Sequence, residues 1–243
     1  MGVPSVGCHC AVCESPDPHD KRTRASILLS WDGHNVVIDT TPDFRFQALR
    51  ARIDRLDAVL YTHAHADHIL GLDDIRPFNF KQRGPIPLYG TATTFARIRE
   101  QFAYVFREVP EGSTVPAVEL KIIHGPFELS GLRFTPIPAM HGPTEVLGFR
   151  VGRAAYLTDF STIPESSKPL LTDLDDWILS ALRDTPHIMH STVAQSLALV
   201  NELKPRRAWF THIAHDLGHE VTNARLPENV RMAYDGLTFE VLY

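Results

Sequence analysis

Residues 62–68 read Thr-His-Ala-His-Ala-Asp-His and follow an apolar run over residues 56–61. Four side chains in this stretch can bind a metal ion, namely His63, His65, Asp67 and His68. The apolar run predicts a buried strand, and side chains two residues apart on a strand share a face. His63 and His65 can therefore bind one ion together, and a tight turn after them can bring Asp67 and His68 toward a second ion. A hydrogen-bonded histidine cluster is the alternative, but the spacing favours a metal site.

Three further candidate ligands each follow a strand predicted later in the chain: His141, Asp159 and His212. Any one of them alone is more often structural than a ligand. Together with residues 62–68 they complete two sites. The predicted ligand sets are His63, His65 and His141 for one metal and Asp67, His68 and His212 for the other, with Asp159 as the bridge. Imidazole and carboxylate ligands suit zinc, manganese or iron. Such a metal pair would acidify a bridging water and hold phosphoryl oxygens.

The composition limits the classes of partner. The 243 residues include 24 basic and 29 acidic side chains, giving a net charge of -5. This balance argues against a broad basic surface for nucleic acid. The sequence has neither an apolar run of membrane-spanning length nor a charged-then-apolar leader. We expect a cytoplasmic protein that does not enter a membrane.

The order of apolar patterns predicts sheets and helices in each half of the chain. Strands are expected at residues 26–31, 36–39, 57–61, 85–89, 118–123, 132–138, 146–151, 154–157, 207–210 and 237–243, with 176–182 as a strand or buried segment. Helices are expected at residues 47–55, 91–106 and 192–203, with a weak one at 226–232, whereas 71–83 is rich in turn formers. This order favours sheet packed on sheet with helices outside. Without a convincing linker, we expect one domain over residues 1–243.

The three cysteines, Cys8, Cys10 and Cys13, lie within six residues of one another. An odd, tight cluster cannot be a disulfide framework, but thiolates at this spacing suit a soft metal such as zinc. Residues 1–20 show no helical or strand period, so they read as a loop held by that metal. A redox or merely exposed role for the thiols is the alternative.

The motif His-x-His-x-Asp-His, followed by single His, Asp and His ligands, is similar to the pattern of the metallo-β-lactamase superfamily. Residues 62–78 resemble its PhnP-type branch, which contains the 5-phosphoribosyl 1,2-cyclic phosphate phosphodiesterases. The resemblance runs from Gly2 to the turn at Asp235 and Gly236. It implies an α+β fold of the αββα four-layer sandwich type, with two mixed β-sheets, helices outside, and the metal site at one edge of the sheets.

The resemblance also implies a structural zinc. In the PhnP-type branch a Cys-x-Cys-x2-Cys loop binds zinc, and the second histidine of a Thr-His-x-x-His motif supplies the fourth ligand. That motif is Thr211-His212-Ile213-Ala214-His215 here, so His215 would join Cys8, Cys10 and Cys13. Residues 1–24 would then be a zinc-anchored loop. His9 is a rival ligand, although its short separation from the cysteines makes tetrahedral binding strained.

Three other side chains have candidate roles beside the metals. A departing alkoxide needs a proton, and His190, which precedes the helix predicted at 192–203, is the expected donor, with His187 as the fallback. A helix-capping or exposed histidine is the alternative. The resemblance implies that Asp39 orients a ligand histidine. Arg76 could contact substrate phosphate, although an exposed salt bridge is also possible.

The ligand pattern predicts a binuclear metal-dependent phosphodiesterase, and the resemblance implies that it hydrolyses a small cyclic phosphate diester similar to 5-phosphoribosyl 1,2-cyclic phosphate. Its cofactors would be two catalytic zinc or manganese ions and one structural zinc, and Asp67 and His190 would be catalytic. A ribonuclease Z-like enzyme is the alternative, but it should need an RNA-holding arm and a basic surface. A PqqB-like cofactor-biosynthesis protein and a non-catalytic metal-binding scaffold are the others.

The start of the chain departs from the family pattern. Family members usually open with a strand that ends in a Gly-Thr-Gly-type turn, and this sequence begins after that point. Either the start codon lies downstream of the true one, or the strand is missing and its neighbour is unpaired. An exposed edge strand would allow a homodimer.

Overall fold

The computed structural model describes residues 2–108 and 110–243. The chain forms two compact units. We call Arg24–His124 the N-terminal sheet unit, and Met1–Thr23 together with Gly125–Tyr243 the C-terminal sheet unit. One domain over residues 1–243 stays a prediction.

The N-terminal sheet unit contains a five-stranded sheet. Its strands, in spatial order, are β1 (Ile27–Trp31), β2 (His34–Ile38), β3 (Ala58–Leu60), β4 (Ile86–Gly90) and β5 (Val118–Ile122). β1 and β2 are antiparallel, and the other pairs are parallel. Asp32 and Gly33 have φ of 45° and 79°, the left-handed conformation that a two-residue hairpin turn requires. Aspartate and glycine adopt it readily, which explains the turn at this point.

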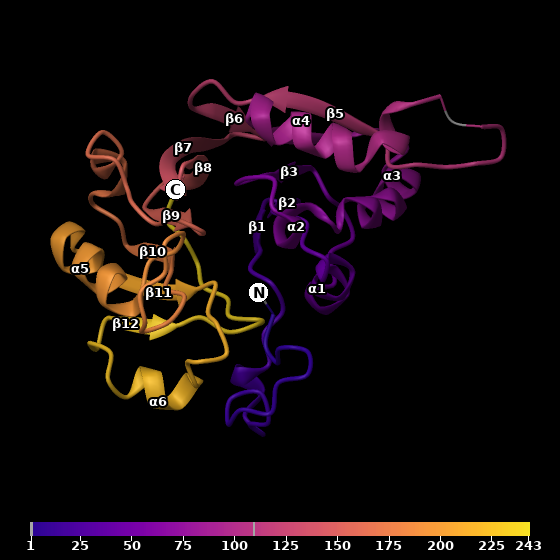
Figure 1. Ribbon diagram of the computed structural model, residues 1–243. Helices are drawn as coiled ribbons and strands as arrows, with labels where there is room; N and C mark the ends of the chain where they lie inside the picture. The colour runs from indigo at the N-terminus through magenta and orange to yellow at the C-terminus, as the bar shows by residue number, and fades with distance from the viewer. Residues whose placement is uncertain (1, 109) are drawn as a thin grey trace. The chain divides into compact units, whose positions relative to one another are not determined.

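The helices of this unit lie around its strands (Figure 1), and three of them contribute Phe44, Ile69 and Phe95 to its buried core. They are α1 (Phe44–Ala51), α2 (Ala66–Ile69), α3 (Arg76–Gln82) and α4 (Ala92–Gln101), with 3-10 turns at Leu72–Ile75 and Ala103–Phe106. Phe95 and Ile98, three residues apart on α4, enter the same core as Val59 of β3 and Leu88 of β4. This core holds in place the loop that follows β3.

Two local expectations differ from the structure here. The expected turn-rich segment 71–83 is largely helical, because Pro77 occupies the first turn of α3, where a missing N–H costs nothing. β3 ends at Leu60, so His63 and His65 lie after the strand rather than on it. The backbone of His65 is still extended, with φ of -69° and ψ of 151°.

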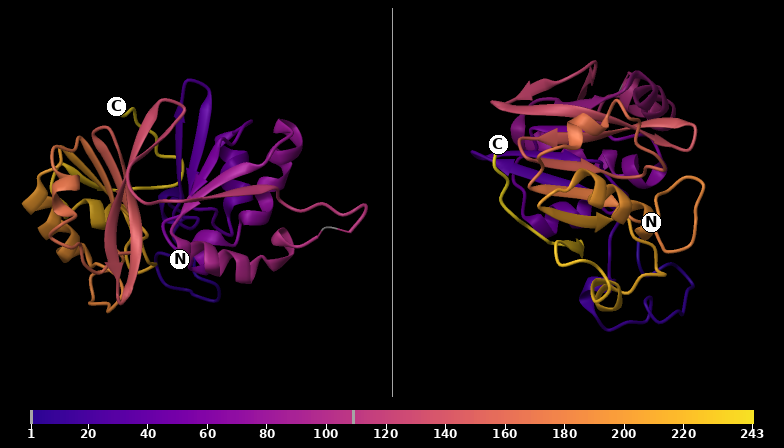
Figure 2. Two further views of the ribbon diagram at one scale, coloured as in Figure 1. Left: turned by 90° about the horizontal axis from the view of Figure 1, so that it is seen from above. Right: turned by 90° about the vertical axis from the view of Figure 1, so that its left-hand side faces the viewer.

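The C-terminal sheet unit contains a seven-stranded sheet. Its strands, in spatial order, are β12 (Val230–Met232), β11 (Arg207–Thr211), β10 (Asp176–Ser180), β9 (Ala154–Leu157), β8 (Thr144–Val151), β7 (Leu132–His141) and β6 (Phe127–Leu129). β9 to β12 pair in parallel and β6 to β9 antiparallel. The long β7–β8 pair can be followed in pink and salmon in Figure 2. The predicted α+β class with two mixed sheets is therefore confirmed.

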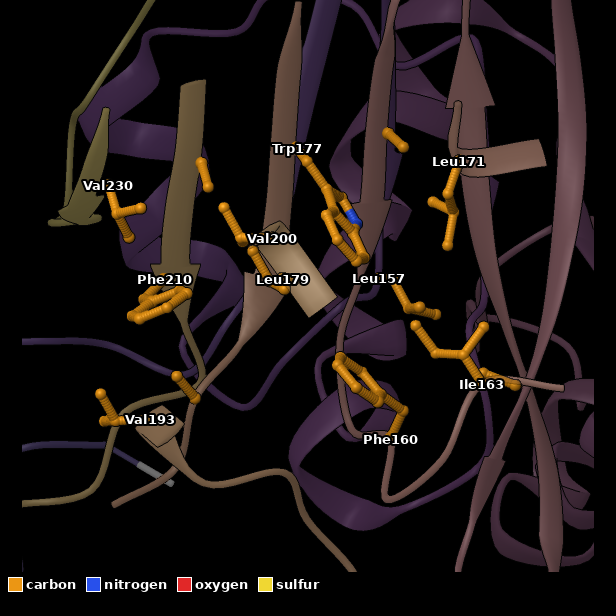
Figure 3. Packing of buried hydrophobic residues seen from close by; sticks show 14 of the residues in the cluster. Leu157, Phe160, Ile163, Leu171, Trp177, Leu179, Val193, Val200, Phe210 and Val230 are labelled. Carbon is orange, nitrogen blue, oxygen red and sulfur yellow. The ribbon is translucent and has the colours of Figure 1, made fainter. Parts of the chain in front are cut away.

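The core of this unit lies between the sheet and α5 (Val193–Leu203). Figure 3 shows Trp177 and Leu179 of β10, Phe210 of β11, and Val193 and Val200 of α5 in this core. Each such side chain stabilises the fold by about 1.5–3 kcal/mol through burial. The core thus fixes the strand ends from which three of the predicted ligands project.

The end of the chain departs from the expected pattern. The weak helix expected at 226–232 is wrong: Val230 and Met232 pair with Ala208 and Phe210 as β12, since tertiary pairing overrides weak local preference. The short helix α6 (His219–Asn223) lies before it. The strand expected at 237–243 is also wrong, because these residues form no ladder and Phe239 instead stacks on Trp209 at 5.5 Å. No helix in the described ranges has the length and apolar character needed to cross a membrane.

Candidate metal centres

The loop after β3 gathers four predicted ligands in the N-terminal sheet unit. The ring centroid of His63 lies 4.6 Å from that of His65 and 4.3 Å from that of His68. Asp67 and His68 follow on α2, with 3.8 Å between Asp67 Oδ2 and His68 Nε2. His63 and His68 are buried, whereas His65 is exposed and Asp67 is half-buried. This geometry brings three imidazoles and one carboxylate close together from the six residues 63–68.

Asp39, directly after β2, organises two of these histidines. Its carboxylate accepts hydrogen bonds from the Thr62 N–H (2.9 Å), the Thr62 hydroxyl (2.7 Å) and His68 Nδ1 (2.7 Å). Because the Thr62 hydroxyl donates to Asp39, it accepts from His63 Nδ1 at 2.9 Å. Complete burial raises the pKa of Asp39, while His68 and the Thr62 donors oppose that shift. Both rings therefore carry hydrogen on Nδ1, and Nε2 is the nitrogen with the lone pair.

The C-terminal sheet unit holds the other three predicted metal ligands at strand ends. His141 ends β7, Asp159 follows β9, and His212 follows β11. His212 Nε2 lies 3.1 Å from Asp159 Oδ1, and candidate ligand atoms of His141 and Asp159 lie within 4.8 Å of each other. His141 Nδ1 donates to the Met189 carbonyl at 2.6 Å, so Nε2 is again the acceptor nitrogen. All three side chains are buried.

Backbone strain marks the same positions. Asp39, Asp159 and His212 have φ of 66°, 51° and 52°, in the left-handed region that non-glycine residues seldom adopt. Asp39 and His212 come directly after β2 and β11, and Asp159 comes two residues after the end of β9. Strain of this kind costs about 1–3 kcal/mol per residue and concentrates at functional sites. The fold therefore tolerates a cost at the points where these polar side chains leave the sheets.

His190 lies among the histidines of the C-terminal sheet unit. Its ring centroid is 4.6 Å from that of His141, 4.9 Å from that of His187 and 5.1 Å from that of His212. Its Nδ1 is buried and makes no hydrogen bond within the described part of the chain. Burial, together with the three neighbouring imidazoles, lowers the pKa of His190 to about 3 although Asp159 opposes the shift. The ring is thus neutral near pH 7 unless an anion approaches it.

The cysteine loop forms a second cluster, wholly within the C-terminal sheet unit. His215 Nδ1 lies 3.3 Å from the Cys8 Sγ, 3.4 Å from the Cys10 Sγ and 3.6 Å from the Cys13 Sγ. A tetrahedral zinc with ordinary bond lengths would hold sulfur and nitrogen about 3.6 Å apart. The N–H of Cys13 and the His215 ring lower the pKa of Cys10 to about 6, which favours the thiolate. These four residues fit a structural zinc.

Two other candidates have partners of their own. His9, the rival zinc ligand, is exposed and its Nδ1 lies 2.8 Å from a Glu14 carboxylate oxygen. Arg76 donates to the Thr114 carbonyl at 3.1 Å and lies 3.6 Å from the Asp73 carboxylate. A role for Arg76 in binding phosphate stays a prediction.

The sequence reasoning missed Thr62 and Met189. Thr62 links Asp39 to His63, and its place next to the first histidine was the available signal. Met189 acts through its backbone carbonyl, which no residue type can reveal. The structure thus adds the acceptors that fix the histidine rings in each unit.

Comparison with known proteins identifies relatives. The model of the β-lactamase superfamily domain matches residues 34–213. A crystal structure described as a new diphosphatase from the PhnP family is 48% identical, with a TM-score of 0.93, and the match covers 100% of this chain and 94% of that one. Zn²⁺-bound PqqB from Methylobacterium extorquens is 20% identical, with a TM-score of 0.80 over 99% of this chain and 96% of that one, and shows the shared fold alone.

A curated relative gives a different name. An octanoyltransferase from Porphyromonas gingivalis is 38% identical over 241 residues, which are 97% of this chain but 48% of that protein. The matched regions span 48%, 30% and 55% of the lengths of the first curated relatives. The family model spans the histidine motif at residues 62–68, and the match to the 48% identical structure covers the whole chain. The chain belongs to the metallo-β-lactamase superfamily of metal-dependent hydrolases, in its PhnP-type branch.

Proposed function

We propose that this chain is a binuclear metal-dependent hydrolase that cleaves a P–O bond in a small phosphodiester or diphosphate. The observation that carries the proposal is the shared orientation of His63, His68 and His141. An oxygen acceptor holds Nδ1 in each ring, which makes Nε2 the metal-binding nitrogen. Packing alone gives no reason for three buried imidazoles to share this arrangement.

The proposed centre keeps the ligand sets predicted from the sequence. Its sets are His63, His65 and His141 for one ion and Asp67, His68 and His212 for the other, with Asp159 as the bridge. Nitrogen and carboxylate donors of this kind suit zinc or manganese. When bound, two such cations acidify a water molecule and neutralise charge that develops on phosphate.

The residues of the chain would orient the substrate and supply a proton. His190 lies beside His141 and His212, where it could meet the oxygen that leaves phosphorus. Its ring is neutral in the resting protein, and a bound phosphate anion would raise its pKa and favour protonation. His190 would then give that proton to the leaving oxygen. The exposed His187 is not assigned to this step, and its Nδ1 accepts a hydrogen bond from the Met189 N–H.

Two substrate classes fit this chemistry. A cyclic phosphate diester of a sugar is one, and a diphosphate is favoured by the 48% identity to the PhnP-family diphosphatase. In both classes an oxygen leaves phosphorus, and the alkoxide that leaves a cyclic sugar diester needs the proton that His190 would give. A long RNA is less suited, because a net charge of -5 would oppose binding a polyanion.

The cysteine cluster supports a third, structural metal. We infer a zinc held by Cys8, Cys10, Cys13 and His215, on the basis of their sulfur–nitrogen separations. His215 stands three residues after the proposed ligand His212. A single turn would therefore carry one ligand of each centre.

The test combines metal analysis with a substrate panel. We expect the purified full chain to hold three metal equivalents and to hydrolyse one of three classes: cyclic ribose phosphates, nucleoside diphosphate diesters, or precursor tRNA. Asp67→Ala should reduce turnover about 1000-fold or more, because the loss of a metal ligand weakens the stabilisation of charge in the transition state. Asp54→Ala is the matched control, because Asp54 is an exposed carboxylate that pairs with Lys81. Equal turnover in wild type and Asp67→Ala would refute the proposal.

A further inference from the structure

The hydrogen bond from His141 to Met189 joins two segments of the C-terminal sheet unit that lie 48 positions apart. His141 ends β7, and Met189 belongs to the connection between β10 and α5. We call residues 183–190 the histidine loop, since it carries both His187 and His190. A carbonyl can only accept, so this bond requires hydrogen on His141 Nδ1.

The histidine loop is closed at its base by backbone hydrogen bonds. The Leu182 N–H donates to the Ser191 carbonyl at 2.9 Å, and the Val193 N–H donates to the Arg183 carbonyl at 3.1 Å. The Arg183 guanidinium also donates to the carbonyls of Thr185 (3.2 Å) and Pro186 (3.1 Å). The loop therefore presents the Met189 carbonyl in a fixed direction despite its exposed surface.

The side chain of Met189 lies against the residue that follows His141. A Cβ added to Gly142 would lie 2.3 Å from the Met189 Sδ and 2.8 Å from its Cε. Gly142 also has φ of 58°, and its N–H donates to the Ser161 hydroxyl at 3.0 Å. Only glycine leaves room for this thioether while the turn keeps its conformation. Met189 thus touches the β7–β8 turn twice, through its carbonyl and through its side chain.

We propose that Met189 is the positioning residue for the metal ligand His141, and that the packing of its side chain against Gly142 holds Met189 in place. Its carbonyl fixes the Nδ1-protonated tautomer of His141, so that Nε2 faces the metal. Its side chain on Gly142 keeps that carbonyl within reach. The inference rests on the proposed function only in taking His141 as a ligand. Loss of such an acceptor typically weakens metal binding about 10- to 100-fold.

The first variant to test is Gly142→Ala, studied in the full chain labelled with ¹⁵N-histidine. Its Cβ should displace the Met189 side chain and draw the carbonyl away from His141. We expect the ring nitrogen shifts of His141 to change from one Nδ1–H tautomer to a mixture. The affinity for Zn²⁺ at the catalytic centre, measured by competition with a chromogenic chelator, should fall at least about tenfold.

Gly131→Ala is the matched control for backbone strain. Gly131 also has a left-handed φ, 80°, on the turn between β6 and β7, but an added Cβ there meets nothing within 4 Å. This variant should keep the His141 tautomer and the Zn²⁺ affinity of wild type. Adding Met189→Ala to Gly142→Ala removes the thioether that Ala would strike, so we expect the double variant to recover part of the lost affinity.

A second pair of variants covers the case in which Gly142→Ala does not fold. Met189→Gly removes the packed side chain, whereas Ile188→Gly adds the same backbone freedom one residue earlier, where the side chain is 88% exposed. Of these two variants, we expect Met189→Gly alone to change His141 from one Nδ1–H tautomer to a mixture. An unchanged tautomer and affinity in both Gly142→Ala and Met189→Gly would overturn the inference. Neither readout needs a substrate. If the variants show the expected tautomer changes but the wild-type protein hydrolyses no substrate, the proposed function is refuted and this inference stands.

Discussion

Asp39 carries more of the candidate site than its size suggests. One carboxylate accepts from the Thr62 N–H, the Thr62 hydroxyl and His68 Nδ1. Through Thr62 it also fixes His63. Its left-handed φ of 66° directs the side chain to these donors from the end of β2. A carboxylate is required, because all three partners donate and only an acceptor can satisfy them.

Asp39→Asn tests this requirement. The new amide has one acceptor oxygen and one donor nitrogen, so it cannot accept from both sides. A donor facing His68 would force hydrogen onto Nε2, where the metal should bind. We expect metal affinity to fall about 10- to 100-fold with the fold retained, as measured by competition titration and circular dichroism.

The chain offers a matched control for this variant. Asp57, directly before β3, lies 3.2 Å from His34 Nδ1 on β2 and accepts a hydrogen bond from the Asn35 N–H. This histidine–aspartate pair contains no predicted metal ligand. Asp57→Asn should therefore leave metal affinity unchanged. Equal affinities in the Asp39 and Asp57 variants would show that Asp39 does not orient the ligands.

At the scale of elements, α6 is tied to the N-terminal segment by buried polar groups. The His219 N–H donates to the Asp20 carboxylate at 2.8 Å, and His19 stacks on the His219 ring at 4.6 Å. Arg22 Nη2 lies 3.4 Å from His219 Nδ1. Burial lowers the pKa of His219, and the positive charge of Arg22 and the neighbouring His19 lower it further, although Asp17 and Glu220 oppose the shift. The folded state therefore favours a neutral His219.

This depressed pKa predicts acid sensitivity. The unfolded chain takes up the His219 proton near its ordinary pKa of about 6.5, whereas the folded protein resists it. The stabilisation from neutral His219 is present above pH 6.5 and is lost as the pH falls, with a slope of at most about 1.4 kcal/mol per pH unit for one proton. Urea unfolding at pH 7.5 and 5.5 should show a smaller loss in His219→Gln than in wild type. Equal losses in the two proteins would contradict this assignment.

At the scale of the whole molecule, the cysteine cluster joins distant parts of the chain. Cys8 and His215 are 207 positions apart, yet their ligand atoms lie 3.3 Å from each other. Within the described residues 2–24, the regular structure is one short 3-10 helix, Pro18–Asp20, and a bridge between Val3 and Arg22. A segment with so little core depends on metal binding for its order.

Cys13→Ser should remove one metal equivalent and destabilise the N-terminal segment by several kcal/mol, since structural zinc contributes directly to folding. Metal analysis and limited proteolysis of residues 1–24 would report both effects. His215→Ala should behave in the same way. His9→Ala should keep the metal, because that ring lies beside Glu14. Loss of the metal in His9→Ala but not in His215→Ala would show that His9 is the fourth ligand.

The order of most strands and of the α4 and α5 helices was predictable from the sequence, because buried strands and amphipathic helices carry a local hydrophobic period. The pairing of Val230 and Met232 with β11 was not, because the partners lie more than 20 residues away and the local composition is ambiguous. The strand predicted over the final residues was wrong because a local pattern was present without a tertiary partner. Residues 237–243 alternate like a strand, yet no neighbouring strand pairs with them in the described structure.

The sequence by itself determined the candidate ligands and the class of chemistry around residues 62–68. Ligand type and close spacing are local properties of the sequence, so they do not depend on β3, which ends before His63. Only the tertiary structure decided which nitrogen each ring presents. That choice depends on Asp39 and on the Met189 carbonyl, which lie 29 positions from His68 and 48 from His141. Hydrogen-bond acceptors brought together by folding, one of them a backbone atom, leave no trace in the order of residue types.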